Sequence, residues 1–175
     1  SRTREVDVAR KRKTLPKDFE ALLATGDLDA LKKVFEGCEL AAHAGVRKST
    51  ALALDGCPDE LTRWLVEQGL DVDAPDSERY TPLYRRAGTG QDVTLLLELG
   101  ADVNGGRRGH PVIEAVRYPE TVRVLAEHGA DLNVVDSAGG PLHTAALSSA
   151  ESTQILLAFG ADPLLLDWRQ RTPLH

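Results

Sequence analysis

The residue types that most often carry chemistry are sparse in this chain, which has five histidines and two cysteines among its 175 residues. A zinc site needs several His, Cys or carboxylate side chains that converge on one point. Neither His43 nor His110 belongs to such a set at ligand spacing, and Cys38 and Cys57 form no CxxC pair. The sequence therefore predicts no metal and no cofactor, and two ordinary buried or half-buried thiols in a reducing compartment.

Motifs for nucleophilic or phosphate chemistry are also missing from the sequence. It contains no nucleophile elbow, no P-loop and no dinucleotide-binding glycine pattern. The stretch GGRRG at 105–109 could be imagined as an anion site, but its surroundings favour a surface loop. Acidic pairs such as Asp59 and Glu60 fall at expected helix starts, where carboxylates stabilise the helix terminus. We therefore expect that this chain is not an enzyme.

Charge is distributed unevenly along the chain. Residues 1–13 carry six Lys or Arg and two acids, a net charge of +4, so the remaining residues carry −10 of the total of −6. An acidic body argues against binding of nucleic acid, which depends on a basic surface. No apolar run approaches the roughly 20 residues that a bilayer span needs, and no apolar stretch of a signal peptide follows the basic start. We expect a cytoplasmic protein that binds neither nucleic acid nor membrane, with the basic start as a solvated arm.

The chain repeats itself. One short motif recurs at intervals of 31, 29, 30 and 32 residues, as Thr50-Ala51-Leu52, Thr81-Pro82-Leu83-Tyr84, His110-Pro111-Val112-Ile113, Gly140-Pro141-Leu142-His143 and Thr172-Pro173-Leu174-His175. A second motif follows the first four copies after 19 or 20 residues, as Gly69-Leu70-Asp71, Gly100-Ala101-Asp102, Gly129-Ala130-Asp131 and Gly160-Ala161-Asp162. An apolar triplet lies between them in a fixed column, starting at Trp64, Leu95, Val124 and Ile155.

Each part of the repeat has a physical role in positioning helices. Pro at the second motif position suits the first turn of a helix, where its missing N–H is not needed. Thr before it can cap that helix, and the Gly of the second motif suits the left-handed residue just past a second helix. Each unit therefore reads as two helices followed by a polar loop, and its apolar triplet must be buried by the neighbouring units. We expect Trp64, Leu95, Val124 and Ile155 to form one buried row.

These motifs resemble those of ankyrin-repeat proteins, most closely at GADVN (100–104) and GADLN (129–133). The resemblance covers about 15–175 and implies an all-α repeat solenoid of stacked helix-turn-helix units with hairpin-like loops. The units are short and irregular, of a bacterial type, and Pro119 stands where the family usually has a glycine turn. In this family His143 and His175 are expected to hydrogen-bond to the backbone of the adjacent loop. The expected parts are a basic extension (1–14), a capping unit (15–48), four repeats (49–79, 80–108, 109–138 and 139–171) and the start of another (172–175).

The two ends of the array differ. In the first unit, Lys33 stands at the position that Trp64, Leu95, Val124 and Ile155 hold in later units. A polar residue at this position suits a terminal repeat, whose outer face must be soluble. After 171 the chain starts a further repeat, so we expect the natural protein to continue or the open end to be covered by a second copy. Leu164, Leu165 and Leu166 replace the polar residues usual in this loop, and an apolar patch of that kind marks an interface or a covered end.

The resemblance implies recognition of another protein through loop tips and first helices, which together line a concave face. Tyr, Trp and Arg carry much of the binding energy at interfaces. The candidate contacts are Asp76, Glu78, Arg79, Tyr84, Arg85, Arg107, Arg108, Tyr118, Asp136, Trp168 and Arg169. We expect a non-catalytic binding scaffold. Two alternatives stay open: homo-oligomeric assembly through the C-terminal end, and a targeting or regulatory module of a longer enzyme.

Overall fold

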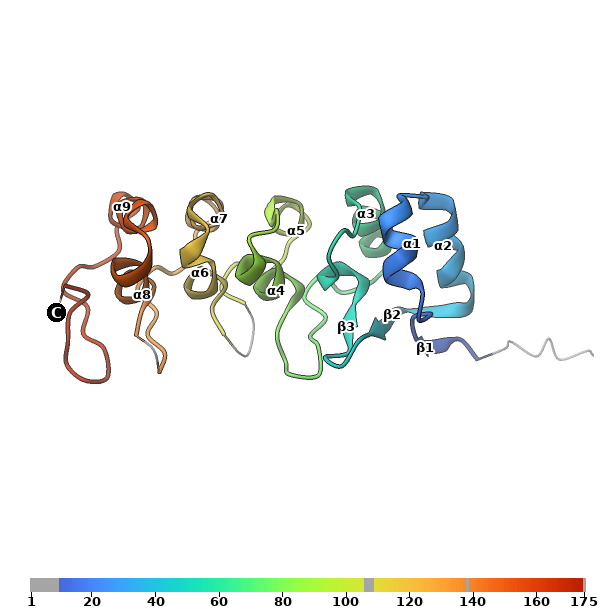
Figure 1. Ribbon diagram of the computed structural model, residues 1–175, viewed down its shortest axis with the longest axis horizontal. Coiled ribbons are helices and arrows are strands. Elements are labelled where there is room, and N and C mark those ends of the chain that lie inside the picture. The colour runs from blue at the N-terminus through green and yellow to red at the C-terminus, as the bar shows by residue number, and fades with distance from the viewer. Residues whose placement is uncertain (1–9, 106–108, 138, 175) are drawn as a thin grey trace, which may run out of the picture. The chain divides into compact units, whose positions relative to one another are not determined.

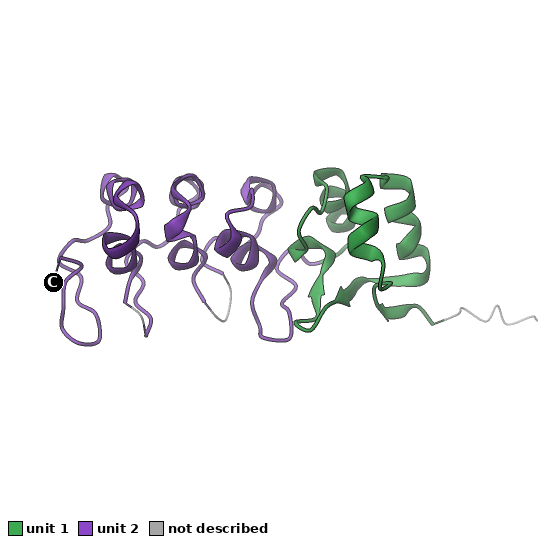
Figure 2. Ribbon diagram, viewed as in Figure 1, with its two compact units in different colours: residues 1–70 green, residues 71–175 purple. Residues whose placement is uncertain are grey.

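A computed structural model describes residues 10–105, 109–137 and 139–174. The chain forms two compact units, residues 1–70 and 71–175, and each is described below by itself (Figure 2).

Unit 1 combines helices with a small sheet. Its elements are β1 (Arg12–Thr14), α1 (Phe19–Thr25), α2 (Leu28–Gly37), β2 (Cys38–Ala44), β3 (Ser49–Thr50), a 3₁₀ turn (Ala51–Ala53) and α3 (Asp59–Glu67). The strand order is β1-β2-β3, with β1 parallel and β3 antiparallel to β2 (Figure 1). For this region the sequence predicted a basic extension (1–14), a helical cap (15–48) and the first repeat (49–79). Three residues of the extension form β1, and residues 1–9 lie outside the described residues.

Aromatic side chains organise the core of unit 1. Phe19 of α1 and Phe35 of α2 are 1% and 2% exposed and meet edge to face, with ring centroids 5.9 Å apart. The Phe35 ring also contacts Trp64 of α3, at 6.1 Å between centroids. Lys32 lies 5.6 Å from the centre of the Trp64 ring, and the indole is half-buried. Burial of these large apolar surfaces joins the three helices.

Unit 2 is a stack of helix pairs. They are α4 (Pro82–Thr89) with α5 (Thr94–Glu98), α6 (Pro111–Glu114) with α7 (Pro119–Glu127), and α8 (Pro141–Ser148) with α9 (Ala150–Ala158); a 3₁₀ turn, Ala115–Arg117, extends α6. Figure 1 shows α4, α6 and α8 in one layer, α5, α7 and α9 in a second, and the connecting loops projecting from the first. This arrangement is the α repeat solenoid that the motifs indicate.

The prolines of the first motif and Thr81 act as the sequence predicted, whereas the buried Thr50 hydroxyl makes no cap hydrogen bond among the described residues. Pro82, Pro111 and Pro141 stand in the first turns of α4, α6 and α8. The Thr81 hydroxyl caps α4 by accepting a hydrogen bond from the Tyr84 N–H at 3.3 Å. Pro119 does not disturb a helix, because it opens α7 in the same way.

The glycine of the second motif also has its predicted conformation. The four residues lie just past a second helix with left-handed φ values of 104°, 93°, 81° and 94°, at Gly69, Gly100, Gly129 and Gly160. Such φ values suit glycine, since it has no Cβ to clash.

The buried column lies one residue away from the expected row. Leu95 and Ile155 are buried, but Trp64 and Val124 are only half-buried. The middle residue of each triplet is instead completely inaccessible, at Leu65, Leu96, Leu125 and Leu156. A helix of 3.6 residues per turn points one residue of a triplet most directly at its neighbours, and here it is the middle one.

A ladder of side-chain hydrogen bonds joins successive loops of unit 2. In each step a side-chain oxygen accepts the N–H of an aspartate 27 or 29 residues later, at 2.8 to 2.9 Å. The pairs are Asp73 with Asp102, Asn104 with Asp131, and Asn133 with Asp162. Leu164 holds the next position and its side chain cannot accept a hydrogen bond, so the ladder stops there.

The helices are short. The longest in the described ranges, α2, has ten residues, whereas a bilayer span needs about 20. None of the described helices could cross a membrane.

Candidate functional site

Two loop tips of unit 2 are built around a buried aspartate. The Asp76 carboxylate accepts the N–H groups of Glu78 and Tyr80, at 2.9 and 3.1 Å. The Asp167 carboxylate accepts the N–H groups of Arg169 and Arg171, at 2.8 and 2.9 Å. Only 8% of Asp76 and 4% of Asp167 is exposed, so both side chains hold the loop from within.

Each of these aspartates also pairs with an arginine. Arg85 Nη2 lies 2.7 Å from Asp76 Oδ2 and also pairs with Glu78. Arg171 donates through Nε and Nη2 to Asp167 Oδ2, at 3.0 and 2.8 Å. Burial alone would raise the pKa of Asp167, but the hydrogen bonds from Arg171 and Arg169 outweigh it and lower the pKa to about 2. Two sequence-predicted contact residues, Asp76 and Arg85, thus serve to fix a loop.

Aromatic rings brace the first of these loops against α4. Tyr80 and Tyr84 stack with ring centroids 4.1 Å apart, and the Arg85 guanidinium lies 4.7 Å from the Tyr80 centroid. Burial and a hydrogen bond to the Glu114 carboxylate raise the pKa of the Tyr84 hydroxyl. Tyr84 is therefore held between two repeats with part of its ring accessible.

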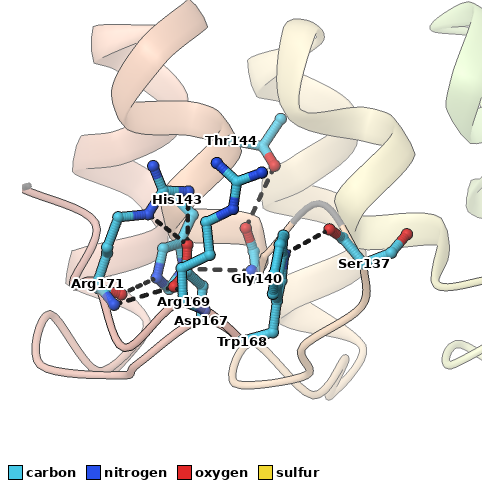
Figure 3. A network of polar contacts seen from close by, with 8 residues as sticks. All are labelled: Ser137, Gly140, His143, Thr144, Asp167, Trp168, Arg169 and Arg171. Carbon is cyan, nitrogen blue, oxygen red and sulfur yellow. Dashed lines mark hydrogen bonds and ion pairs between the residues drawn. The ribbon is translucent and has the colours of Figure 1, made fainter.

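Trp168 is the most exposed aromatic side chain of these loops. Its indole N–H donates to the Ser137 carbonyl on the neighbouring loop at 2.9 Å, and 61% of the residue stays exposed. The Arg169 guanidinium lies 4.4 Å from the indole centre. Figure 3 shows the ring fixed between the two loops, beside the cluster of Asp167, Arg171 and His143. This geometry presents an exposed apolar surface, held by one hydrogen bond, next to a cation.

His143 ties the same loop to α8. One ring nitrogen accepts the Gly140 N–H at 3.2 Å, and the other lies 3.0 Å from the Arg171 carbonyl (Figure 3). The predicted bond from His143 to the adjacent loop is thus confirmed, whereas His175 lies outside the described residues. His128 closes α7, with Nδ1 2.8 Å from the Val124 carbonyl.

The remaining candidate contacts occupy different settings. Arg79 is exposed on the loop tip with a left-handed φ of 71°. Tyr118 is 37% exposed and covers Gly90, where a Cβ would lie 2.4 Å from the Tyr118 ring. Asp136 is exposed and forms a backbone bridge with Gly139. Arg107 and Arg108 lie outside the described residues.

The three leucines of the last loop are not equivalent. Leu164 is 73% exposed and Leu166 45% exposed, whereas Leu165 is half-buried near Gly140. Leu164 and Leu166 thus add apolar surface to the loop that carries Trp168.

Sequence reasoning missed two parts of this surface. The first is Tyr80, whose stack with Tyr84 could have been inferred from an aromatic residue just before the Thr-Pro-Leu motif. The second is the ladder of Asp73, Asn104 and Asn133, which the two-residue spacing after each motif aspartate signals. Among the described residues no group of three or more His, Cys, Asp or Glu could hold a metal ion.

Comparison with known proteins identifies the repeat independently. The family model described as "Ankyrin repeats (3 copies)" matches residues 50–136. A protein of Neurospora crassa named "Ankyrin repeat protein nuc-2" is 33% identical over 112 residues, which cover 59% of this chain and 10% of that protein. The chain therefore spans about a tenth of the length of this relative.

Proposed function

The chain belongs to the ankyrin-repeat family, and we propose that it is a non-catalytic scaffold that binds another protein through the loop tips and first helices of unit 2. Ankyrin repeats are in general modules for protein–protein interaction. Binding would then be recognition by shape and charge, with no bond made or broken.

The observation that carries this proposal is the fixed and exposed indole of Trp168. An ordered side chain loses little conformational entropy when a partner binds, so more of the contact energy appears as affinity. The Ser137 hydrogen bond and the Arg169 guanidinium provide that order. Trp and Arg are also the residue types enriched among the residues that dominate binding energy.

The candidate contacts take two roles in this proposal. The exposed side chains make the direct contacts in this proposal, namely Arg79, Tyr118, Trp168, Arg169, Leu164 and Leu166.

Three other candidates support the surface from within the loop. Arg85 forms ion pairs with both Asp76 and Glu78, and these pairs set the shape of the loop. Partly accessible Tyr84 and exposed Asp136 lie at the edge of the surface.

The proposed place of action is the cytoplasm. Cys38 and Cys57 are buried, and within the described part of the chain neither forms a disulfide, which fits a reducing compartment. The proposed partner is a protein, since the net charge of −6 disfavours nucleic acid.

Affinity capture with matched variants tests this function. The purified protein, Trp168→Ala and Glu127→Ala are each used as bait in host extract. Glu127 is a suitable control because it is exposed on α7, a second helix that lies outside the proposed binding surface. Loss of about 2 kcal/mol, or some thirtyfold in affinity, is expected for Trp168→Ala alone. Equal retention of the same partner by both variants would contradict the role of the loop tips.

Self-association is a second candidate, because the last helix pair leaves apolar side chains accessible. Leu147 is 90%, Leu157 45% and Phe159 41% exposed. Exposed apolar surface of this kind favours association. Light scattering across a concentration range tests it: a rising mass that Leu157→Glu abolishes supports assembly, and a constant monomer mass contradicts it.

A further inference from the structure

A pocket in unit 1 lies in the part of the chain that precedes the family match at 50–136. Its volume is about 530 Å³, within the range of small-molecule sites. Three segments form it: the end of β1 with the turn after it, the start of α1, and the hairpin between β2 and β3. The lining residues that matter here are Leu15, Lys17, Phe19, Glu20, His43 and Lys48.

The floor of the pocket is apolar. Leu15 and Phe19 are 7% and 1% exposed, so their side chains belong to the core and present only an edge to the pocket. Pro16 and Ala44 add further apolar lining. Pro16 and Ala44 are half-buried, so an apolar group of a ligand would displace water mainly from these two residues, at a gain of free energy.

The rim is cationic. Lys17 and Lys48 come from segments 31 residues apart, and both line the same pocket. Among the residues that the structure describes, neither ammonium group has a hydrogen-bond or ion-pair partner. His43 adds an imidazole, and Glu20 is the one carboxylate in the lining. This lining is cationic in a chain whose net charge is −6.

The backbone at Lys48 is strained. Its φ is 52°, in the left-handed region, and its N–H closes the hairpin turn by donating to the Gly45 carbonyl at 3.2 Å. A glycine would adopt this conformation without the cost of about 1 kcal/mol that a side chain adds. Strain of this kind concentrates at functional sites, where the side chain is needed for another purpose.

We infer that this pocket binds a carboxylate carried on a short apolar body, with the carboxylate between Lys17 and Lys48 and the apolar body on Pro16 and Ala44. The same chemistry occurs in a free aliphatic acid and at the carboxyl terminus of a peptide that ends in an apolar residue. The inference concerns unit 1 alone and stands or falls independently of the loop tips of unit 2.

The first test is titration of the protein with hexanoate, followed by amide chemical shifts. Saturable shifts confined to residues 14–20 and 43–48 are expected, with a Kd of about 1 mM for so small a ligand. Hexanamide, the neutral analogue, should bind at least tenfold more weakly. Equal binding of the two, or no shifts up to about 10 mM hexanoate, would overturn the inference.

Variants then separate binding from folding. Lys48→Gly removes the charge and relieves the strained φ, so it should raise thermal stability while weakening hexanoate binding at least threefold. Lys17→Gln should weaken binding to a similar extent. Lys33→Gln, which changes an exposed lysine on α2 outside the pocket, is the matched control and should bind as the unmodified protein does. Equal affinity of all three variants would contradict the proposed site.

A peptide distinguishes the two sources of carboxylate. A tetrapeptide that ends in leucine is compared with its C-terminal amide under the same conditions. Tighter binding of the free-carboxylate peptide than of hexanoate indicates a peptide terminus, and weaker binding indicates a free acid. Binding of the amide as tight as that of the free-carboxylate peptide would overturn the requirement for an anion.

Discussion

At the scale of single residues, Asp73 and Asp167 show how the same side chain can weaken or support a fold. Asp73 Oδ2 accepts the Asp102 N–H, but Oδ1 is buried without a hydrogen-bond partner among the described residues. Burial raises the pKa of Asp73, and the charges of Asp71 and Asp102 add to the effect. Asp167, in contrast, is saturated with donors. The charge is therefore unfavourable at Asp73 and favourable at Asp167.

Asp73→Asn should stabilise the protein at neutral pH. The amide keeps an oxygen acceptor for the ladder, as Asn104 and Asn133 do, and removes the buried charge. A gain of about 0.5 kcal/mol is expected, because solvent screens this half-exposed group. The folded pKa is above the unfolded pKa, so wild-type stability falls as the pH rises through it. Urea unfolding should show the gain at pH 7 and little gain near pH 3; a loss at pH 7 would contradict this account.

Asp167→Asn should have the opposite effect. Its folded pKa of about 2 lies below the ordinary value of 3.8, so its contribution is present at neutral pH and is lost as the pH falls from about 4 to about 2. The variant should be less stable than the wild type at pH 7. The difference should shrink across that acid window in urea unfolding measurements. A difference that is constant with pH would assign the effect to packing rather than charge.

At the scale of elements, close contact between repeats is visible at Gly90 and Tyr118. Gly90 ends α4 with a φ of 70°, and the Tyr118 ring fills the space where a Cβ would lie. Gly90→Ala should destabilise by about 2–4 kcal/mol, from strain and overpacking together. Tyr118→Ala in the same chain should restore the part due to overpacking. Thermal unfolding of the single and double variants measures both, and an additive loss would contradict the clash.

Loop tips offer a second test at this scale. Arg79 and Gln170 both have left-handed φ values, 71° and 58°, three residues after the buried aspartate of their loops. Gln170→Gly should stabilise the protein by about 0.5 kcal/mol. This gain is the strain relieved at the left-handed φ, minus the cost of the greater flexibility that glycine gives the unfolded chain. Chemical unfolding measures this gain, with Ser77→Gly, which relieves no such strain, as the control. A destabilised Gln170→Gly would show that the side chain itself holds the loop.

The elements of unit 2 could be read from the sequence, whereas much of unit 1 could not. Pro82, Pro111 and Pro141 mark helix starts by local chemistry alone, because a first-turn proline needs no partner elsewhere in the fold. β2 depends on pairing with β1, 24 or more residues away, and no local pattern in CELAAHA signals that partner. The ion pair between Asp76 and Arg85 could not be predicted for a similar reason. The sequence shows that both residues are charged, but not that they lie close enough to pair.

At the scale of the whole molecule, the residues that recur in every repeat account for stacking, and the residues that differ between repeats give each loop its own exposed surface. The inaccessible leucines and the ladder from Asp73 to Asp162 recur, so they account for stacking. Trp168 and Leu164 do not recur at their positions, and each adds exposed surface. We expect specificity to reside in such residues, because stacking leaves them free to vary.

Hydrogen exchange on the complex with the captured protein tests the central claim most directly. If the loop tips and first helices of unit 2 form the binding surface, added protection should fall on residues 76–79, 135–137 and 164–170 and on the first turns of α4, α6 and α8. Amides of α5, α7 and α9 should exchange as in the free protein. Protection confined to α5, α7 and α9 or to unit 1, with unchanged exchange around Trp168, would contradict the account.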